Sequence, residues 1–187
     1  MQSDRAQPSR EEVKSSVTAL SVARGFARAV LTEYDYLFDV REAELVNHLT
    51  EVGGNSISGM NWVLGKTLAS LPYSMQQRFF NYAVVPGYDN VLMLRKFMIR
   101  QKMEEAIKSG KKRFVILGGG YDINGLVMAL KNSDIRVYEI DRGPTRECKL
   151  QGLKNIPESI GFDKVEFTAE SDDVSVSEVG TVRVFLM

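Results

Sequence analysis

Apolar residues recur at helical spacing along the first part of the chain and predict a largely helical N-terminal half. The segment SSVTALSVARGFARAVL (15–31) is rich in helix formers, and Ser15 or Ser16 is placed to cap it. REAELVNHL (41–49) predicts a short amphipathic helix that ends at a Gly/Ser-rich break, EVGGNSISG (51–59). Further helices are expected over 61–71 and over 73–110, the latter interrupted at Pro86-Gly87.

After residue 110 the pattern changes to short apolar runs separated by helical segments. RFVIL (113–117) is nearly continuous in apolar residues, as is typical of a strand buried on both faces. IRVYEID (135–141) and KVEFTA (164–169) predict two more strands, and helices are expected between the strands. This βαβαβ order predicts parallel strands joined by right-handed crossovers, the arrangement of an α/β Rossmann-like sheet. The tail after residue 170 has no clear period.

These patterns predict how the chain is organised. Residues 1–14 are polar and are expected to form a flexible arm, and residues 15–187 a single domain. Within it, 15–110 would form a helical cap and 111–187 a partial Rossmann-like core. A complete doubly wound sheet has strands on both sides of its switch point, whereas about three strands are predicted here. The sheet is therefore expected to have an open edge that is available for pairing with another chain.

Composition excludes several classes of function. The 24 basic and 24 acidic residues give a formal net charge of zero, which argues against nonspecific nucleic-acid binding. No apolar run approaches the roughly 20 residues of a membrane span, and no signal-like segment follows the first residue, so a cytoplasmic protein is expected. The only histidine, His48, leaves no basis for a histidine-rich metal cluster and is expected on an exposed helix face. Cys148 is expected to be a small helix residue.

A glycine-rich turn is the main candidate for chemistry. Gly118, Gly119 and Gly120 directly follow the first predicted strand, where the lack of side chains lets a ligand approach the backbone. Such turns also occur for purely structural reasons, but an acidic strand end follows here. Asp141 lies about 20 residues further on, the spacing at which an acid reaches a ribose. Glu139 is a weaker ribose candidate, and a turn or helix-cap role remains the alternative for Asp141.

The residues after this turn favour a ligand without phosphates. A dinucleotide fingerprint, G-x-G-x-x-G, would place its third glycine at position 123, which is Ile123. Asp122 at the helix start would also repel a pyrophosphate. S-adenosylmethionine (SAM) carries no phosphate; its ammonium suits Asp122 or nearby carbonyls, and its carboxylate requires a cation. A plain helix cap is an equally good interpretation of Asp122.

Several segments together resemble the leucine carboxyl methyltransferase family, which consists of class I SAM-dependent methyltransferases. The resemblance covers roughly residues 15–170. The segments that carry it are TALSVARGFARA (18–29), LRKFMIR (94–100), VILGGGYD (115–122), VYEID (137–141) and Lys149.

The resemblance implies roles for individual residues. In that family the residue matching Arg95 pairs with the SAM carboxylate, as a guanidinium fork is suited to do. The glycine matching Gly118 approaches the methionine moiety, and the aspartate matching Asp141 holds the ribose. A basic residue of the N-terminal helix also reaches the carboxylate, and its counterpart here is Arg28 or Arg24.

The implied activity is O-methylation of a carboxylate, such as a protein C-terminus or a small acid; a modified tRNA base side chain is another acceptor that the family allows. Family members are longer, with an adenine-contacting acidic segment and substrate-shaping elements beyond the third strand. ESDDVS (170–175) is a degenerate candidate for the first of these. One alternative is therefore a truncated paralogue that binds SAM or a partner without catalysis, and a less favoured one is an NAD(P)-dependent oxidoreductase.

Overall fold

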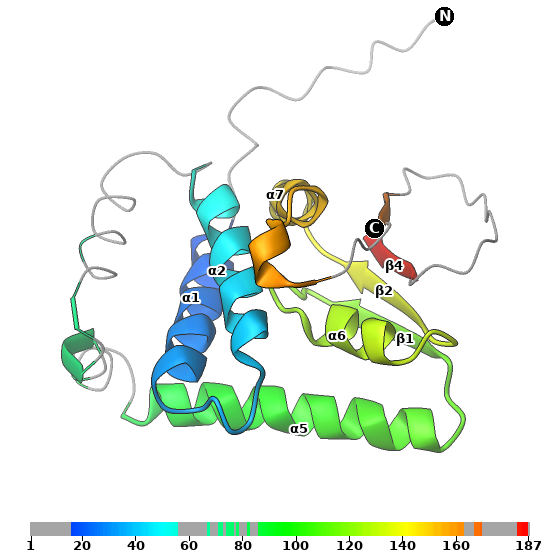
Figure 1. Cartoon of the computed structure of the whole chain (residues 1–187), viewed down its shortest axis with the longest axis horizontal. Helices are drawn as coiled ribbons and strands as arrows, with labels where there is room; N and C mark the ends of the chain where they lie inside the picture. Colours follow the sequence, from blue (N-terminus) through cyan, green and yellow to red (C-terminus); the bar gives the residue numbers. More distant parts are fainter. Residues whose placement is uncertain are drawn as a thin grey trace, which may run out of the picture.

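A computed structural model describes residues 16–55, 86–162, 167–169 and 183–186, together with a few positions between 67 and 82. The predicted arm (1–14), almost all of the predicted helix 61–71, and the segment 170–182 lie outside the described residues. In the described part, three long helices lie beside a parallel sheet and its two connecting helices (Figure 1). None of the described helices is long and apolar enough to cross a membrane.

The N-terminal helices form an antiparallel pair. Helix α1 spans Val17–Thr32 and begins at the predicted cap, because the Ser16 side chain accepts a hydrogen bond from the Ala19 amide. Helix α2 spans Val40–Gly54, so it runs five residues beyond the predicted segment 41–49. Their apolar faces, from Leu20 to Val30 and from Ala43 to Leu49, meet in the main core.

The glycines of EVGG were wrongly predicted to end α2. Gly53 and Gly54 are helical, and a Cβ atom on Gly53 would lie 1.9 Å from the hydroxyl oxygen of the buried Tyr121. A glycine is needed at position 53 because an aromatic side chain from the sheet half crosses the helix there. Gly53 therefore serves packing, although in a single sequence the pair of glycines looks like a loop signal.

Helix α5, Tyr88–Lys108, follows the predicted interruption. Gly87 has a φ of 75° and forms its N-cap, where glycine adopts the left-handed conformation easily. Figure 1 shows α5 running along one side of both the α1–α2 pair and the sheet unit. It packs against α1 of the helical cap and against α6 of the sheet unit, so residues of α5 contact both parts of the molecule.

The sheet contains four parallel strands in the order β1-β2-β4-β3. β1 (Arg113–Leu117), β2 (Arg136–Ile140) and β3 (Phe167–Ala169) match predicted strands. β4 (Arg183–Leu186) was not predicted, because its tail shows no period, and it lies between β2 and β3. α6 (Asn124–Lys131) and α7 (Gly143–Lys154) connect the strands, and the short 3-10 helix η2 spans Glu158–Ile160. The predicted α/β architecture with parallel strands is thus present.

The prediction that β1 is buried on both faces was wrong. Val115 and Leu117 are 62% and 74% exposed, whereas Phe114 and Ile116 are half-buried against the core. β1 is an edge strand that pairs only with β2 among the described strands. Both crossovers advance the same way across the sheet, so right-handed connections place α6 and α7 on one face. The other face of β1 is left uncovered by these helices.

A polar bridge and a close approach join α2 to α7. His48 is half-buried rather than exposed as predicted, and its Nε2 lies 3.0 Å from the Gly152 carbonyl oxygen. A Cβ atom on Gly152 would lie 2.7 Å from a methyl group of Leu49. Cys148 is buried in α7, in agreement with the prediction of a small helix residue. The cap helices and the sheet helices therefore share one core.

We expect Gly53→Ala to destabilise the protein. Glycine to alanine in a helix normally stabilises by about 0.5–1 kcal/mol, but here the added methyl group meets the rigid Tyr121 ring, and overpacking costs about 1–3 kcal/mol. Gly54→Ala is the matched control, because its Cβ would meet only the mobile end of the Arg24 side chain. Thermal unfolding followed by circular dichroism should show a lower midpoint for Gly53→Ala alone. Equal midpoints for the two variants would contradict the packing role.

Candidate functional site

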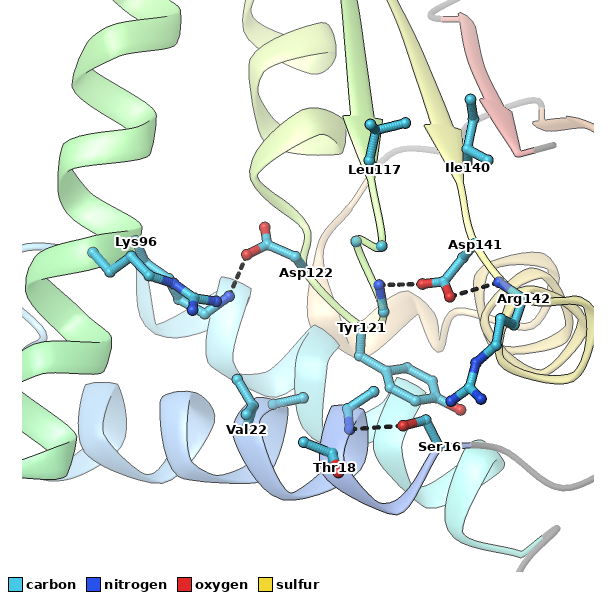
Figure 2. Close-up of a pocket in the computed structure, with 16 residues that line it drawn as sticks. Ser16, Thr18, Val22, Lys96, Leu117, Tyr121, Asp122, Ile140, Asp141 and Arg142 are labelled. Carbon is cyan, nitrogen blue, oxygen red and sulfur yellow. Dashed lines mark hydrogen bonds and ion pairs between the residues drawn. The ribbon is translucent and has the colours of Figure 1, made fainter. Parts of the chain in front are cut away.

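A cavity of about 760 Å³ lies at the carboxyl ends of β1 and β2, beside the start of α1 (Figure 2). Its volume is within the roughly 300–1,000 Å³ of typical small-molecule sites, and its position is where ligands bind in open parallel sheets. Four segments line it: the N-terminal turns of α1, the middle of α5, the loop after β1 and the residues after β2. The lining residues are Ser16, Thr18, Ala19, Val22, Ala23, Arg95, Lys96, 117–122 and 140–142.

The glycine-rich turn shapes one wall of this cavity. Gly118 and Gly120 have φ values of 64° and 55°, in the left-handed region that glycine adopts without strain. A Cβ atom on Gly120 would also lie 3.1 Å from Ala19 of α1. Gly119 is close-packed for a different reason, since its Cβ would lie 3.3 Å from the Glu139 carboxylate. All three predicted glycines line the cavity, and the close approach of Gly120 to Ala19 brings the turn against α1.

Asp141 lies on the cavity wall directly after β2. Its carboxylate accepts hydrogen bonds from the Gly120 amide at 2.5 Å and from the Arg142 amide at 2.7 Å. These bonds join the glycine turn to the start of α7, as the turn-or-cap interpretation predicts. An ionised carboxylate has about four acceptor positions, so ribose hydroxyls remain compatible with both bonds.

Glu139 is buried beneath the turn and does not line the cavity. Its carboxylate accepts a hydrogen bond from Lys149 Nζ at 2.5 Å, and both side chains are 3% exposed. The same ammonium donates to the Asp122 carbonyl oxygen at 2.5 Å. Burial raises the pKa of Glu139, and the charge of Lys149 opposes this rise only in part. Glu139 thus supports the turn through Lys149, a residue to which sequence reasoning gave no role.

Asp122 bonds to the first amide of α6, as the helix-cap interpretation predicts, and it also lines the cavity, whereas its contact with a ligand stays a prediction. One carboxylate oxygen accepts a hydrogen bond from the Asn124 amide at 2.7 Å, which caps α6, and the other pairs with Lys96 Nζ. Burial alone would raise the pKa of Asp122, but the charge and hydrogen bond of Lys96 lower it. Asp122 therefore stays ionised on the cavity wall. Sequence reasoning missed Lys96, which is next to Arg95 and also lines the cavity.

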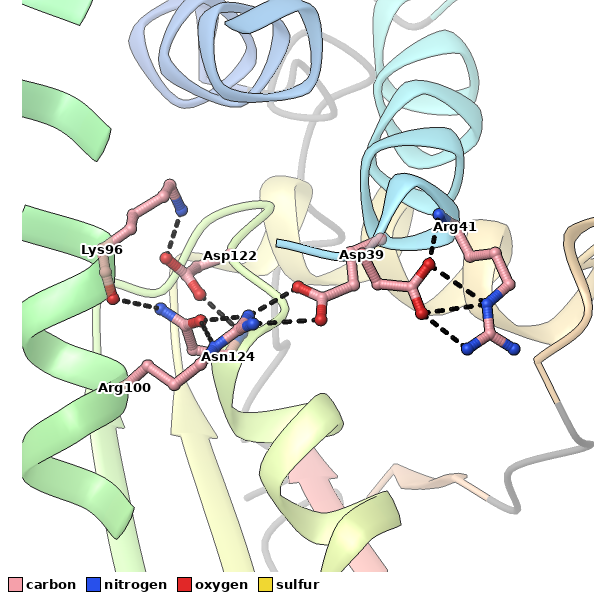
Figure 3. Close-up of polar contacts among 7 residues, drawn as sticks. Asp39, Arg41, Lys96, Arg100, Asp122 and Asn124 are labelled. Atoms are coloured by element: carbon pink, nitrogen blue, oxygen red, sulfur yellow. Dashed lines mark hydrogen bonds and ion pairs between the residues drawn. The ribbon is translucent and has the colours of Figure 1, made fainter. Parts of the chain in front are cut away.

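Helix α5 is held in place by Arg100. Its guanidinium donates to both carboxylate oxygens of Glu42, at 2.6 and 3.0 Å, and to Asn124 Oδ1 at 2.7 Å (Figure 3). All three residues are buried. The guanidinium of Arg100 on α5 thus connects to α2 through an ion pair and to α6 through a hydrogen bond. Arg95 lies five residues earlier and lines the cavity, and its predicted contact with the SAM carboxylate stays a prediction.

The candidate arginines of α1 do not line the cavity. Arg24 donates to the Thr50 carbonyl oxygen at 3.4 Å, and Arg28 donates to the Gln76 side chain. The structure thus brings Arg95, Asp122, Asp141 and the three glycines together around one cavity. It leaves Glu139, Arg28 and Arg24 outside the lining.

Comparison with known proteins places the chain in a family. A family model described as leucine carboxyl methyltransferase matches residues 19–176, which include every segment that lines the cavity except Ser16 and Thr18. Searches of curated proteins and of solved structures found no match. Since the matched region covers most of the 187 residues, the chain belongs to the leucine carboxyl methyltransferase family.

Proposed function

We propose that this chain is a class I, Rossmann-like methyltransferase that binds SAM in the cavity and methylates a carboxylate oxygen. Membership of the family implies SAM-dependent methyl transfer. The observation that carries the proposal for this chain is the set of groups around the cavity: a glycine turn and an acid at adjacent strand ends, facing a cationic helix.

The groups around the cavity suit the chemical parts of SAM. Asp141 would accept hydrogen bonds from the ribose hydroxyls, and the bare backbone at Gly118 would lie along the methionine chain. Arg95 supplies the guanidinium fork that a carboxylate requires, and Asp122 supplies a charge opposite to the ammonium. Arg28 does not enter this proposal, because its guanidinium binds Gln76.

The proposed reaction requires little of the protein beyond positioning. The bound sulfonium supplies an electrophilic methyl group, and the protein orients the acceptor and excludes water. A carboxylate acceptor is already ionised at neutral pH, so it needs no catalytic base. Acceptors of this kind are a protein C-terminus or a small acid. Transfer of labelled methyl groups from SAM to such acceptors, in a form released by mild alkali as for an ester, is the direct test.

The proposed function predicts which cofactor the protein prefers. We expect S-adenosylhomocysteine or SAM to bind at least tenfold more tightly than NAD or ATP, because Asp122 at the start of α6 repels phosphate groups. Titration calorimetry with each ligand measures this preference. Equal or tighter binding of NAD would contradict both the choice of cofactor and the proposed function.

We expect Asp141→Asn to weaken S-adenosylhomocysteine and adenosine to a similar degree, because both ligands carry the ribose. Loss of the charge from a hydrogen bond to a ligand is worth about 1.5–3 kcal/mol. Asparagine keeps one acceptor oxygen for the Gly120 amide and loses only the exposed bond to the Arg142 amide, so the turn should survive. Calorimetric affinities, with circular dichroism to check the fold, measure the effect. Unchanged affinities would assign Asp141 to the turn alone.

Arg95 is predicted to recognise the other end of the ligand. Arg95→Lys should weaken S-adenosylhomocysteine while the charge is kept, and Arg95→Ala should weaken it further, because lysine cannot form the two parallel bonds of the guanidinium. Adenosine, which lacks the amino-acid end, should bind both variants normally. Lys102→Ala is the control on the same helix, since that side chain is exposed and outside the cavity.

The two ligands distinguish recognition from folding. If adenosine and S-adenosylhomocysteine lose affinity equally in the Arg95 variants, Arg95 acts through the fold. If neither ligand is affected, the assignment of Arg95 is wrong.

A further inference from the structure

We propose that the Lys96–Asp122 ion pair is a charge-matched seat for the amino-acid end of the ligand. In this proposal Lys96 is a second cation, beside Arg95, for the ligand carboxylate. The site would then select ligands that carry both an ammonium and a carboxylate. This inference rests on the proposed function and states which part of the cofactor the cavity recognises.

The pair lies in the cavity wall and is largely shielded from solvent. Lys96 Nζ pairs with Asp122 Oδ2, and the two side chains are 6% and 21% exposed. The ammonium also lies 4.8 Å from the centre of the Phe26 ring, so one side of it is covered by an aromatic face. Figure 2 shows Lys96 reaching from α5 toward Asp122 on the loop after β1. Charges in such a place interact more strongly than charges in water.

Both groups have hydrogen-bonding capacity beyond their mutual contact. A lysine ammonium has three N–H donors, and one of them is directed at Asp122. The Asp122 carboxylate receives one bond from Lys96 and one from the Asn124 amide, which is half of its acceptor capacity. A ligand ammonium and a ligand carboxylate can therefore be added without breaking the pair.

The arrangement of charges distinguishes zwitterions from simple cations. A zwitterion can place its ammonium near Asp122 and its carboxylate near Lys96 and Arg95, so that each charge faces an opposite one. A ligand with an ammonium alone brings a third cation close to Lys96 and Arg95, and it has no carboxylate to face these two cations. Repulsion of this kind is how a site rejects a near relative of its ligand.

Lys96 is not required to hold the turn. The position of Asp122 is fixed independently, by the Asn124 amide on its side chain and by Lys149 on its carbonyl oxygen. The turn is further held by Asp141 through the Gly120 amide. Lys96 is thus not needed to position the turn, and its place on the cavity wall allows contact with a ligand.

Three ligands test the proposal on the whole chain by calorimetry. S-adenosylhomocysteine carries both charges, its decarboxylated analogue carries only the ammonium, and 5′-methylthioadenosine carries neither. Wild-type protein should prefer S-adenosylhomocysteine over the decarboxylated analogue by at least about tenfold, the usual size of one charge-assisted hydrogen bond. A weaker preference than threefold would overturn the proposal without any variant.

Variants then identify the residue that is responsible for the preference for ligands with a carboxylate. Lys96→Gln should weaken S-adenosylhomocysteine by about tenfold and leave methylthioadenosine unchanged, so that the preference for the carboxylate falls. Lys96→Arg keeps a cation and should retain most of the preference. Asp122→Asn should weaken both amine-bearing ligands but not methylthioadenosine. Lys102→Gln, an exposed lysine on the same helix, is the matched control and should change none of the three affinities.

The outcomes separate this inference from the proposed function. If wild-type protein binds none of the three ligands, the proposed function itself is wrong and this inference with it. If wild-type protein binds S-adenosylhomocysteine and Lys96→Gln binds it equally well, only the role of Lys96 is wrong. Equal loss of all three ligands in Lys96→Gln would also overturn it, because Lys96 would then act through the fold.

Discussion

A buried lysine holds the glycine turn in place, and the candidate site depends on it. Lys149 reaches from α7 to the Glu139 carboxylate of β2 and to the Asp122 carbonyl of the turn. One ammonium thereby joins α7, β2 and the turn. Removing it would leave the carboxylate uncompensated in the core, a change that costs about 3–5 kcal/mol in comparable buried pairs.

This anchor contributes geometry more than stability. Because the pKa of Glu139 is raised in the fold, the folded state binds its proton more tightly than the unfolded state does. Stability from this group is therefore greatest below the ordinary pKa of glutamate and falls as pH rises through the raised value. Lys149 does not fully offset the desolvation of its partner. What it provides is a fixed direction for the turn, and hence for the cavity wall.

The fold was predictable where a local pattern determines it. The strand RFVIL, the glycine turn and Asp141 after β2 follow from apolar runs and spacing, and all three are present in that order, although RFVIL lies at the edge of the sheet and not in its middle. Lys96, Arg100 and Gly53 could not be predicted, because their roles depend on partners far along the chain. Position 53 has no room for a side chain because Tyr121 crosses the helix there, and the buried Arg100 is neutralised by Glu42 and hydrogen-bonded by Asn124. β4 was missed because the tail as a whole shows no clear period, although its residues RVFL form a short apolar run like RFVIL; the strand pairs with β2 and β3.

The zero net charge of the chain conceals how its charges are arranged. Three ion pairs are buried or nearly so: Arg100 with Glu42, Lys149 with Glu139, and Lys96 with Asp122. The first two pairs have both partners deep in the core and bind no other charged side chain among the described residues. The third lies on the wall of the cavity, where its hydrogen-bonding capacity faces space that a ligand can enter. Position alone therefore separates an ion pair that builds the scaffold from one that is able to recognise a charged ligand.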